Sequence, residues 1–455
     1  MSLRLSPRHL ALFTWLLLAC ATEQEVVSYE IDPNEDFSDN VPETYSKQPK
    51  QRRRGRRVEF LDRPATPDES KAVEKLMVRA EALRGLEFLY PVPVHIQNKA
   101  AMKRFVKAQI DREKTERMRV RWVALGVIPA SEKIEEKSAD SLADQVLGYY
   151  DPKEKYLAVS EDAGYALTRA TDFEHSVETR SVIVHELVHA LQDQHFDLDR
   201  KIKQVKTSDE TTALFALVEG DATLCSLEYT FARIGLKAES LISDPEFFSK
   251  VMNGLKPTVG AAAIGPDAMQ NPILFRYRGG ALFAARLTVH GGTKAMDNAF
   301  VHVPASSVEI AQPTLYMDKW KPKRLATPSI ELLKNNGYKV MYEDVVGHLE
   351  LAAYLNLGGV AADDVAADWS GDRFIALQHG DDFAALWVLR FNDEATAQRA
   401  LTMAQDVGEA MNDPKEPVPF SATSVGHYVL VMRGVSPKLA NPIAETFGRS
   451  IKIDD

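Results

Sequence analysis

The chain has 455 residues, with 55 Lys and Arg against 65 Asp and Glu, which gives a formal net charge of −10. That length exceeds one ordinary hydrophobic core, so a second domain is expected. The negative charge argues against a nucleic-acid-binding protein, because such proteins carry a basic surface that neutralises phosphate.

The N-terminal segment has the pattern of an export signal. Basic residues precede an apolar run at positions 10–19, and that run is too short to span a bilayer comfortably. The run ends Leu17-Leu18-Ala19-Cys20, which resembles the bacterial lipobox. This resemblance implies a signal peptide at residues 1–19 and a lipid on Cys20, which places the protein at the bacterial cell envelope, on its periplasmic or outer-membrane face. An ordinary signal peptide with an incidental cysteine is the alternative.

Residues 20–65 are predicted to form a disordered tether. Acidic residues dominate its first part, a basic cluster follows at 50–57, and few apolar residues lie between them. Such a segment cannot bury enough apolar surface to fold. The basic cluster suits a solvated position or the surface of an anionic membrane.

Ordered structure is expected from Thr66 onward. Thr66 as cap, Pro67 in the first turn and Glu69 three residues after the cap predict the start of a helix. Residues 91–96 read as a short strand, and the charged run 100–121 as one amphipathic helix with its charges on a solvated face.

A β-hairpin is predicted between Gln145 and Ser160. Two strand-like runs, 147–150 and 155–159, are joined by the turn sequence Asp151-Pro152-Lys153-Glu154. An edge strand at this place can pair with an extended peptide through backbone hydrogen bonds.

The most informative segment is His185-Glu186-Leu187-Val188-His189, which lies inside an apolar run. On a helix turning about 100° per residue, two histidines four apart share one face and can hold one metal ion, with the glutamate beside it. Apolar residues at helical spacing, and no proline or glycine from 177 to 195, predict a buried helix. Two neutral imidazoles on such a helix can bind zinc tetrahedrally, and a third protein ligand is then needed.

Two residues compete to be that third ligand, and the first is His195. It lies six residues after His189, where metzincin-type enzymes place their third histidine, but those enzymes have glycine where this chain has Gln192. If the helix continues, six residues rotate His195 by roughly 600° and carry it about 9 Å along the axis. Without glycine to reverse the chain, ligation by His195 is not expected.

The second candidate is Glu219, which lies among apolar residues at helical spacing. Ser208 is the expected cap of this helix, and an acidic first turn suits its positive end. A carboxylate in such surroundings is costly to bury unless a cation neutralises it. Gly220 removes a side chain beside it and can let two helices approach closely. We therefore select Glu219.

The sequence HELVHALQDQHFDL followed by ALVEGDAT resembles the gluzincin branch of zinc metallopeptidases, specifically peptidase-MA-like bacterial envelope proteins. These proteins pair HExxH with a glutamate in a later Glu-Gly-x-Ala helix. The likeness extends to VLGYYDPKEKYLAVS before the motif and to RYRGGALFAARLTVHGG and PASSVEIAQP after it. It implies that His185, His189 and Glu219 bind one zinc ion and that Glu186 is the catalytic base.

The likeness weakens in the last of these segments. Gln312 stands where histidine is expected in the pattern Ser-Thr-Glu-x-x-x-His-Pro, and Ser307-Val308 also departs from it. The sequence therefore assigns no role to this loop.

Peptide-bond hydrolysis is the chemistry that this ligand set implies. Three protein ligands leave zinc a fourth position for water, whose pKa falls towards 7, and Glu186 can pass the proton of that water to the leaving amine. Tyr277 is the candidate donor to the oxyanion, ahead of Arg276 and His302. The alternative for Tyr277 is an aromatic ring packed at a helix start.

The predicted fold class is α+β. A mainly helical, zincin-like metallopeptidase domain with a small sheet is expected at 66–325, and a smaller α+β domain without a ligand cluster at 335–455. In the second domain, strands are expected at 374–377, 385–391 and 428–433, and helices at 393–407 and 437–447.

The sequence leaves three functions open. The first is a lipid-anchored zinc endopeptidase that acts on envelope or extracellular polypeptides and binds the membrane through its N-terminal lipid. The second is a catalytically silent zinc-binding envelope protein that acts in binding or assembly. The third is a lipoprotein without metal, in which His185 and His189 are ordinary buried polar residues. The sequence does not give the oligomeric state.

Overall fold

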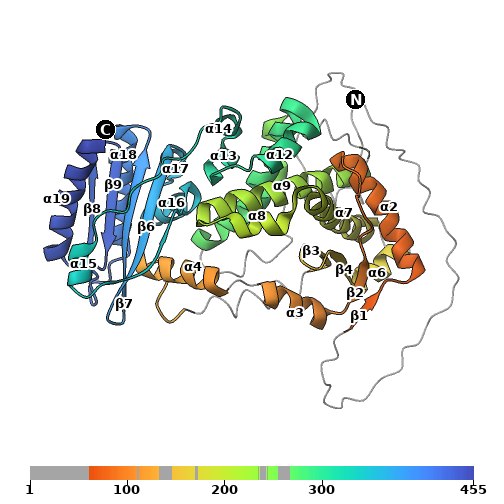
Figure 1. The fold of residues 1–455 in the computed structure, drawn as a ribbon, viewed down its shortest axis with the longest axis horizontal. Helices are drawn as coiled ribbons and strands as arrows, with labels where there is room; N and C mark the ends of the chain where they lie inside the picture. The colour runs from red at the N-terminus through yellow and green to blue at the C-terminus, as the bar shows by residue number, and fades with distance from the viewer. Residues whose placement is uncertain are drawn as a thin grey trace, which may run out of the picture.

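The computed structural model describes residues 61–109, 112–132, 146–169, 173–233, 235, 242, 244–254 and 267–454. The predicted signal peptide, Cys20 and most of the predicted tether lie outside these residues. The described chain is α+β, as expected, with two separate sheets and many helices. The molecule is elongated, with the five-stranded sheet towards one end and the four-stranded sheet, beside α7, towards the other; the long helices α9 and α12 lie between (Figure 1).

The first sheet has four strands in the order β1-β2-β4-β3. The strands are β1 (Asp62–Pro64), β2 (Val94–Gln97), β3 (Gly148–Asp151) and β4 (Tyr156–Ser160). Strands β3 and β4 form the predicted antiparallel hairpin, and β3 lies at the sheet edge. Strand β1 lies inside the range 20–65 that was expected to be a disordered tether, but it pairs with β2. Ordered structure therefore begins a few residues before Thr66.

Helix α2 (Pro67–Arg84) begins where the sequence predicted. The Thr66 side chain accepts the N–H of Glu69, and the Glu69 carboxylate accepts the N–H of Thr66, which completes the capping box. The helix ends at Gly85, whose φ of 71° suits glycine because it lacks a Cβ.

The run 100–121 forms two helices, α3 (Lys99–Gln109) and α4 (Arg112–Ala124), rather than the one predicted. The prediction that its charges lie on a solvated face is wrong at Arg121, which is 2% exposed. Its guanidinium donates to Asp344 at 3.0 Å and to Glu350 at 2.7 Å, both far along the chain. The sequence pattern could not show this, because the two partners come from the C-terminal part of the fold.

Two long helices carry the segments that the sequence singled out. Helix α7 (Phe173–Phe196) buries Leu187 and Val188 against the first sheet and α2, and helix α9 (Ser208–Arg233) packs on it. The cap of α9 is Thr207 rather than Ser208, because the Thr207 hydroxyl accepts the N–H of Glu210. The Ser208 hydroxyl donates instead to Asp344.

Shorter helices complete this part of the chain. They are α6 (Glu161–Thr168), α8 (Leu198–Gln204), α11 (Pro245–Gly254), α13 (Ser307–Ala311) and α14 (Pro313–Met317). Helix α12 (Asp267–Val301) is kinked at Gly291 and Gly292, whose φ and ψ are not helical.

The C-terminal part is built on a five-stranded antiparallel sheet in the order β5-β6-β7-β9-β8. The strands are β5 (Lys339–Asp344), β6 (Trp369–His379), β7 (Asp382–Phe391), β8 (Phe420–Val425) and β9 (Tyr428–Arg433). The helices are α15 (Glu331–Asn335), α16 (His348–Leu355), α17 (Asp363–Ala367), α18 (Glu394–Ala410) and α19 (Pro437–Asp454). The three strands and two helices predicted here are confirmed, whereas β5, β8 and the short helices were missed.

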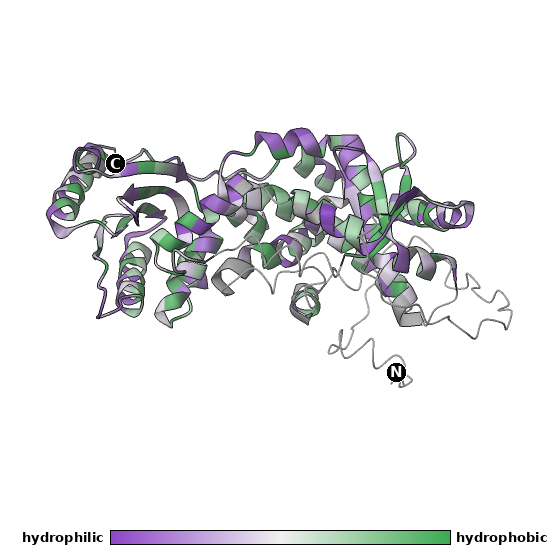
Figure 2. Cartoon of the chain, turned by 90° about the horizontal axis from the view of Figure 1, so that it is seen from below, coloured by the Kyte–Doolittle hydropathy of each residue, from purple (hydrophilic) through white to green (hydrophobic). Residues whose placement is uncertain are grey.

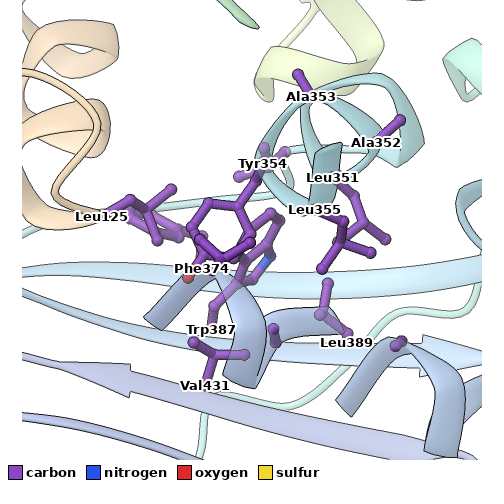
Figure 3. Packing of buried hydrophobic residues seen from close by; sticks show 14 of the residues in the cluster. Leu125, Leu351, Ala352, Ala353, Tyr354, Leu355, Phe374, Trp387, Leu389 and Val431 are labelled. Atoms are coloured by element: carbon purple, nitrogen blue, oxygen red, sulfur yellow. The ribbon is translucent and has the colours of Figure 1, made fainter. Parts of the chain in front are cut away.

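Helices cover both faces of this sheet. Successive side chains along each strand point to opposite faces, so neighbouring residues pack in different hydrophobic clusters. In β6, Phe374 packs in one hydrophobic cluster with α16, α17 and α18, and the next residue, Ile375, packs in another with α15 and α19. Trp387 contacts both Tyr354 and Phe374, with ring centroids 5.6 and 5.9 Å apart, and Figure 3 shows the three side chains grouped together.

Helix α4 belongs to this second core although it lies early in the chain. Val120, Trp122 and Leu125 pack in the same cluster as Trp387, and Figure 3 shows Leu125 beside that ring. The C-terminal sheet is therefore attached to the rest of the molecule by a shared hydrophobic core.

No described helix combines the length and hydrophobicity needed to cross a membrane. Hydrophilic and hydrophobic residues are interspersed along the long helices (Figure 2).

Candidate metal centre

The structure brings together His185, His189 and Glu219, the three ligands selected from the sequence. His185 Nε2 lies 3.0 Å from His189 Nε2 and 3.1 Å from Glu219 Oε2, and His189 Nε2 lies 3.5 Å from Glu219 Oε2. The three side chains are 13 to 18% exposed, so solvent still reaches the group. We refer to these three residues as the metal cluster.

The geometry of the metal cluster fits a tetrahedral zinc ion. Zn–N and Zn–O distances near 2.0–2.1 Å place tetrahedral ligand atoms about 3.3 Å apart, which agrees with the three observed separations. No other group of three or more His, Cys, Asp or Glu side chains in the described residues has such an arrangement. One ion is therefore the number that the donor set accommodates.

A close crossing of two helices sets the position of Glu219. A Cβ on Gly220 would lie 2.1 Å from the backbone of Gly280, and a Cβ on Gly280 would lie 2.0 Å from the carbonyl oxygen of Ala216. Only glycine fits on both sides, so α9 and α12 touch through their backbones, as the sequence suggested for Gly220. This contact brings Tyr277, one turn before Gly280, alongside the metal cluster.

A glutamine fixes the orientation of His189. Gln192 Nε2 donates to Val218 O at 3.0 Å and to Asp221 Oδ2 at 2.9 Å, so its Oε1 faces His189 Nδ1 at 2.9 Å and accepts that N–H. His189 then carries its proton on Nδ1 and leaves Nε2 free as a ligand, which is the tautomer that metal binding requires.

Behind this glutamine lies a buried ion pair. Arg84 Nε donates to Asp221 Oδ2 at 2.6 Å, and a second guanidinium nitrogen lies 2.9 Å from Asp297 Oδ1. Arg84 and Asp221 are 1% and 2% exposed. The sequence analysis missed Gln192, Asp221 and Arg84. Gln192 lies three residues after His189, on the same helix face, and that spacing was the available signal.

The charges in the metal cluster favour an added cation. Burial raises the pKa of Glu219, but His189 and His185 outweigh it and hold that pKa below its usual value. Burial lowers the pKa of His189, but the Glu219 charge and hydrogen bond outweigh it and raise the pKa to about 9. The carboxylate therefore attracts positive charge, as a proton on the imidazole or as a metal ion.

Glu186 lies beside the metal cluster and contacts the edge strand. Its Oε2 accepts the backbone N–H of Tyr150 in β3 at 2.9 Å. Burial is the largest cause that raises the pKa of its carboxyl above the ordinary value. The hairpin is held against α7 by Asp193, which accepts from the Tyr150 hydroxyl at 2.8 Å and from Lys155 Nζ at 2.7 Å.

Tyr277 lies next to the metal cluster. Its ring is stacked on that of His185, with centroids 6.4 Å apart. Burial, followed by the charge of Glu219, raises the pKa of its hydroxyl well above the ordinary value, so it stays protonated and can donate a hydrogen bond.

The remaining candidates are not part of the metal cluster. Helix α7 continues past His195, whose Nε2 lies 2.8 Å from Glu87 O, so His195 lies outside the metal cluster. His302 lines a separate hollow of about 750 Å³ that includes none of the ligands. Gln312 ends α13, and its amide donates to Ala367 O in the C-terminal part.

Comparison with known proteins gives no family for this chain. No family model, no curated protein and no solved structure matches it. The functional conclusion therefore depends on the side chains of the site.

Proposed function

We propose that this protein is a zinc-dependent peptidase of the zincin type, with one zinc ion held by His185 Nε2, His189 Nε2 and the Glu219 carboxylate. The observation that carries the proposal is the separation of the three ligand atoms, 3.0, 3.1 and 3.5 Å, with a glutamate of the same HExxH segment beside them. When bound, zinc would supply a Lewis acid and lower the pKa of water at its open position.

Glu186 is the general base in this proposal. Its Oε2 is held by the Tyr150 N–H, which leaves Oε1 free to take the proton of the attacking water and to pass it to the leaving amine. The backbone contact also fixes the carboxylate relative to β3, so the base and an extended peptide on that edge strand would be held in register.

Tyr277 is the proposed donor to the oxyanion. A protonated hydroxyl beside the His185 ring can stabilise negative charge that develops on the scissile carbonyl oxygen.

The proposed location is the bacterial envelope, with the lipid on Cys20 as the membrane anchor. Support for it comes from the sequence of the first twenty residues alone. The proposed substrates are accordingly envelope or extracellular polypeptides.

The test is Glu186→Gln in the full chain, measured by zinc content and by hydrolysis of a peptide library with and without a chelator. Gln can still accept the Tyr150 N–H through its Oε1, so zinc binding is expected to stay at one ion per chain while the rate falls by about 10²–10⁴-fold. Glu178→Gln, at an exposed position on α7, is the matched control and should change neither quantity.

Three results would contradict the proposal. An unchanged rate in Glu186→Gln would remove this residue as the base. Tight zinc without hydrolysis in the unsubstituted chain would favour a silent zinc-binding envelope protein. Absence of zinc would leave His185 and His189 as ordinary buried polar residues.

A further inference from the structure

Arg276 has no counter-ion among the residues that the structure describes. It lies on α12, one turn before the Gly220–Gly280 crossing, and is partly buried. Its Nε is shielded from solvent and has no hydrogen-bond partner among the described residues. No carboxylate of the described chain forms an ion pair with its guanidinium.

The guanidinium of Arg276 lies over the ring of Phe215, within range of the Glu219 charge. Its Cζ is 5.0 Å from the centroid of the Phe215 ring, and Phe215 is one turn before Glu219 on α9. The next residue on α12, Tyr277, stacks on His185. Arg276 on α12 and the metal ligands on α7 and α9 therefore approach the same region from three helices.

Neither nearby carboxylate is available to neutralise Arg276. Burial lowers its pKa, and the charges that oppose this belong to Tyr277, Glu219 and Glu350. Glu219 is directed to the two histidines, and Glu350 accepts from Arg121 at 2.7 Å.

The other buried arginines show what a structural role requires. Arg84 pairs with Asp221 and Asp297, and Arg121 pairs with Asp344 and Glu350. A partly buried charge without such partners destabilises the fold. We therefore expect Arg276 to bind a ligand that supplies the missing negative charge.

We propose that Arg276 binds a carboxylate of the substrate and so gives the site a preference for peptides with an acidic group near the scissile bond. The planar guanidinium matches a carboxylate through two parallel hydrogen bonds. The acidic group is either an Asp or Glu side chain or the free C-terminal carboxylate. This inference rests on the proposed zinc peptidase function.

The first experiment measures binding rather than turnover. The zinc-loaded full chain is titrated by calorimetry with acetohydroxamate and with succinic monohydroxamate, which have the same metal-binding group but differ in a carboxylate. The carboxylate is expected to tighten binding about 10-fold or more, because hydrogen bonds between charged groups are strong. In Arg276→Gln this gain should vanish while acetohydroxamate binds as before.

Two variants keep the experiment interpretable. Arg276→Lys keeps the charge but not the two-pronged geometry, so part of the gain should remain. Arg286→Gln removes an exposed charge on the same helix and should leave the gain intact. Circular dichroism and zinc content check that each variant is folded.

A second experiment separates the two sources of the carboxylate. Peptides that differ only by Glu against Gln beside the cleaved bond test the side chain, and free against amidated C-termini test the terminus. The preferred member of the pair should lose its advantage in Arg276→Gln.

Equal binding of the two hydroxamates, or a gain that survives Arg276→Gln, would overturn the inference. Binding of both hydroxamates with the expected gain but no peptide hydrolysis would overturn the proposed function and leave the Arg276 assignment standing. A chain that binds neither hydroxamate would overturn both.

Discussion

Two polar clusters that each include a residue of α9 differ in how their charges are neutralised. At the N-terminus of this helix lies the junction cluster, Arg121, Ser208, Asp344 and Glu350, which joins α9 and α4 to the C-terminal sheet. Three turns further along lies the metal cluster. In the junction cluster, Arg121 forms ion pairs with both carboxylates, and Ser208 also donates to Asp344.

In the metal cluster the three ligand atoms face one another, and the His189 proton is held on the far side of its ring by Gln192. The charges of the junction cluster are thus paired within the protein, whereas in the proposed function an added cation completes the metal cluster. This difference separates polar groups that hold the fold together from polar groups that bind a ligand.

Removal of the charge at the centre of the junction cluster should have the largest effect on stability. Arg121→Met leaves Asp344 and Glu350 buried without a counter-charge, so the free energy of unfolding should fall by about 3–5 kcal/mol. Urea denaturation measures it. Zinc content per folded chain should not change.

The control for this prediction is Arg399→Met. Arg399 pairs with Asp364 at the surface, where solvent screens the charges, so stability should change little. Similar losses in the two variants would mean that the junction cluster is no more important than a surface pair.

An intermediate effect is expected behind the metal cluster. Gln192→Ala frees the His189 ring from its hydrogen bond and should weaken zinc binding about 10- to 100-fold, as measured by competition with a chelator. Gln194→Ala, on the same helix, removes contacts to the 89–90 backbone only and should leave zinc affinity unchanged. Unchanged affinity in Gln192→Ala would remove this residue as a positioning group.

The smallest effect concerns pH and His348, which lies next to the junction cluster. Burial lowers its pKa to about 3, and it contacts Ser307, which donates to Asp209. In the unfolded chain the imidazole of His348 takes up a proton near pH 6.5, whereas burial prevents this in the folded chain. The contribution of the neutral imidazole to stability is therefore present above pH 6.5 and is lost as the pH falls towards 3. Between pH 7 and pH 5 the loss should reach at most about 2 kcal/mol.

The measurement is urea denaturation of the unsubstituted chain and of His348→Asn at both pH values. Asn can keep the hydrogen bond to Ser307 without the titration, so its loss on acidification should be smaller. Burial raises the pKa of Asp209 to about 6, which favours the folded state as the pH falls and acts equally in both proteins. Identical pH dependence in the two proteins would exclude His348 as the cause.

Local signals predicted much of this chain. The capping box at Thr66, the β3–β4 hairpin and the uninterrupted helix α7 depend on residues close in sequence, and the structure shows all three. The i, i+4 spacing of His185 and His189 likewise determines a shared helix face before any tertiary contact forms.

Several features could not be predicted because they depend on residues far apart in the chain. The solvated face expected around Arg121 failed because its carboxylate partners lie more than two hundred residues away. Thr207 rather than Ser208 caps α9, because the Ser208 hydroxyl donates a hydrogen bond to Asp344.

The sequence by itself determined the helix that carries the two histidines and Glu186, because helical periodicity is a local property. It also marked Glu219 and Gly220, since a carboxylate among apolar residues requires a neutralising partner and glycine permits close approach. Only the tertiary structure decided that the carboxylate meets both imidazoles at 3.1 and 3.5 Å and that Gln192 orients one of them. It also decided that Arg276 has no counter-ion in the described part of the chain. These facts arise where separate helices cross, and packing geometry sets them rather than the local pattern.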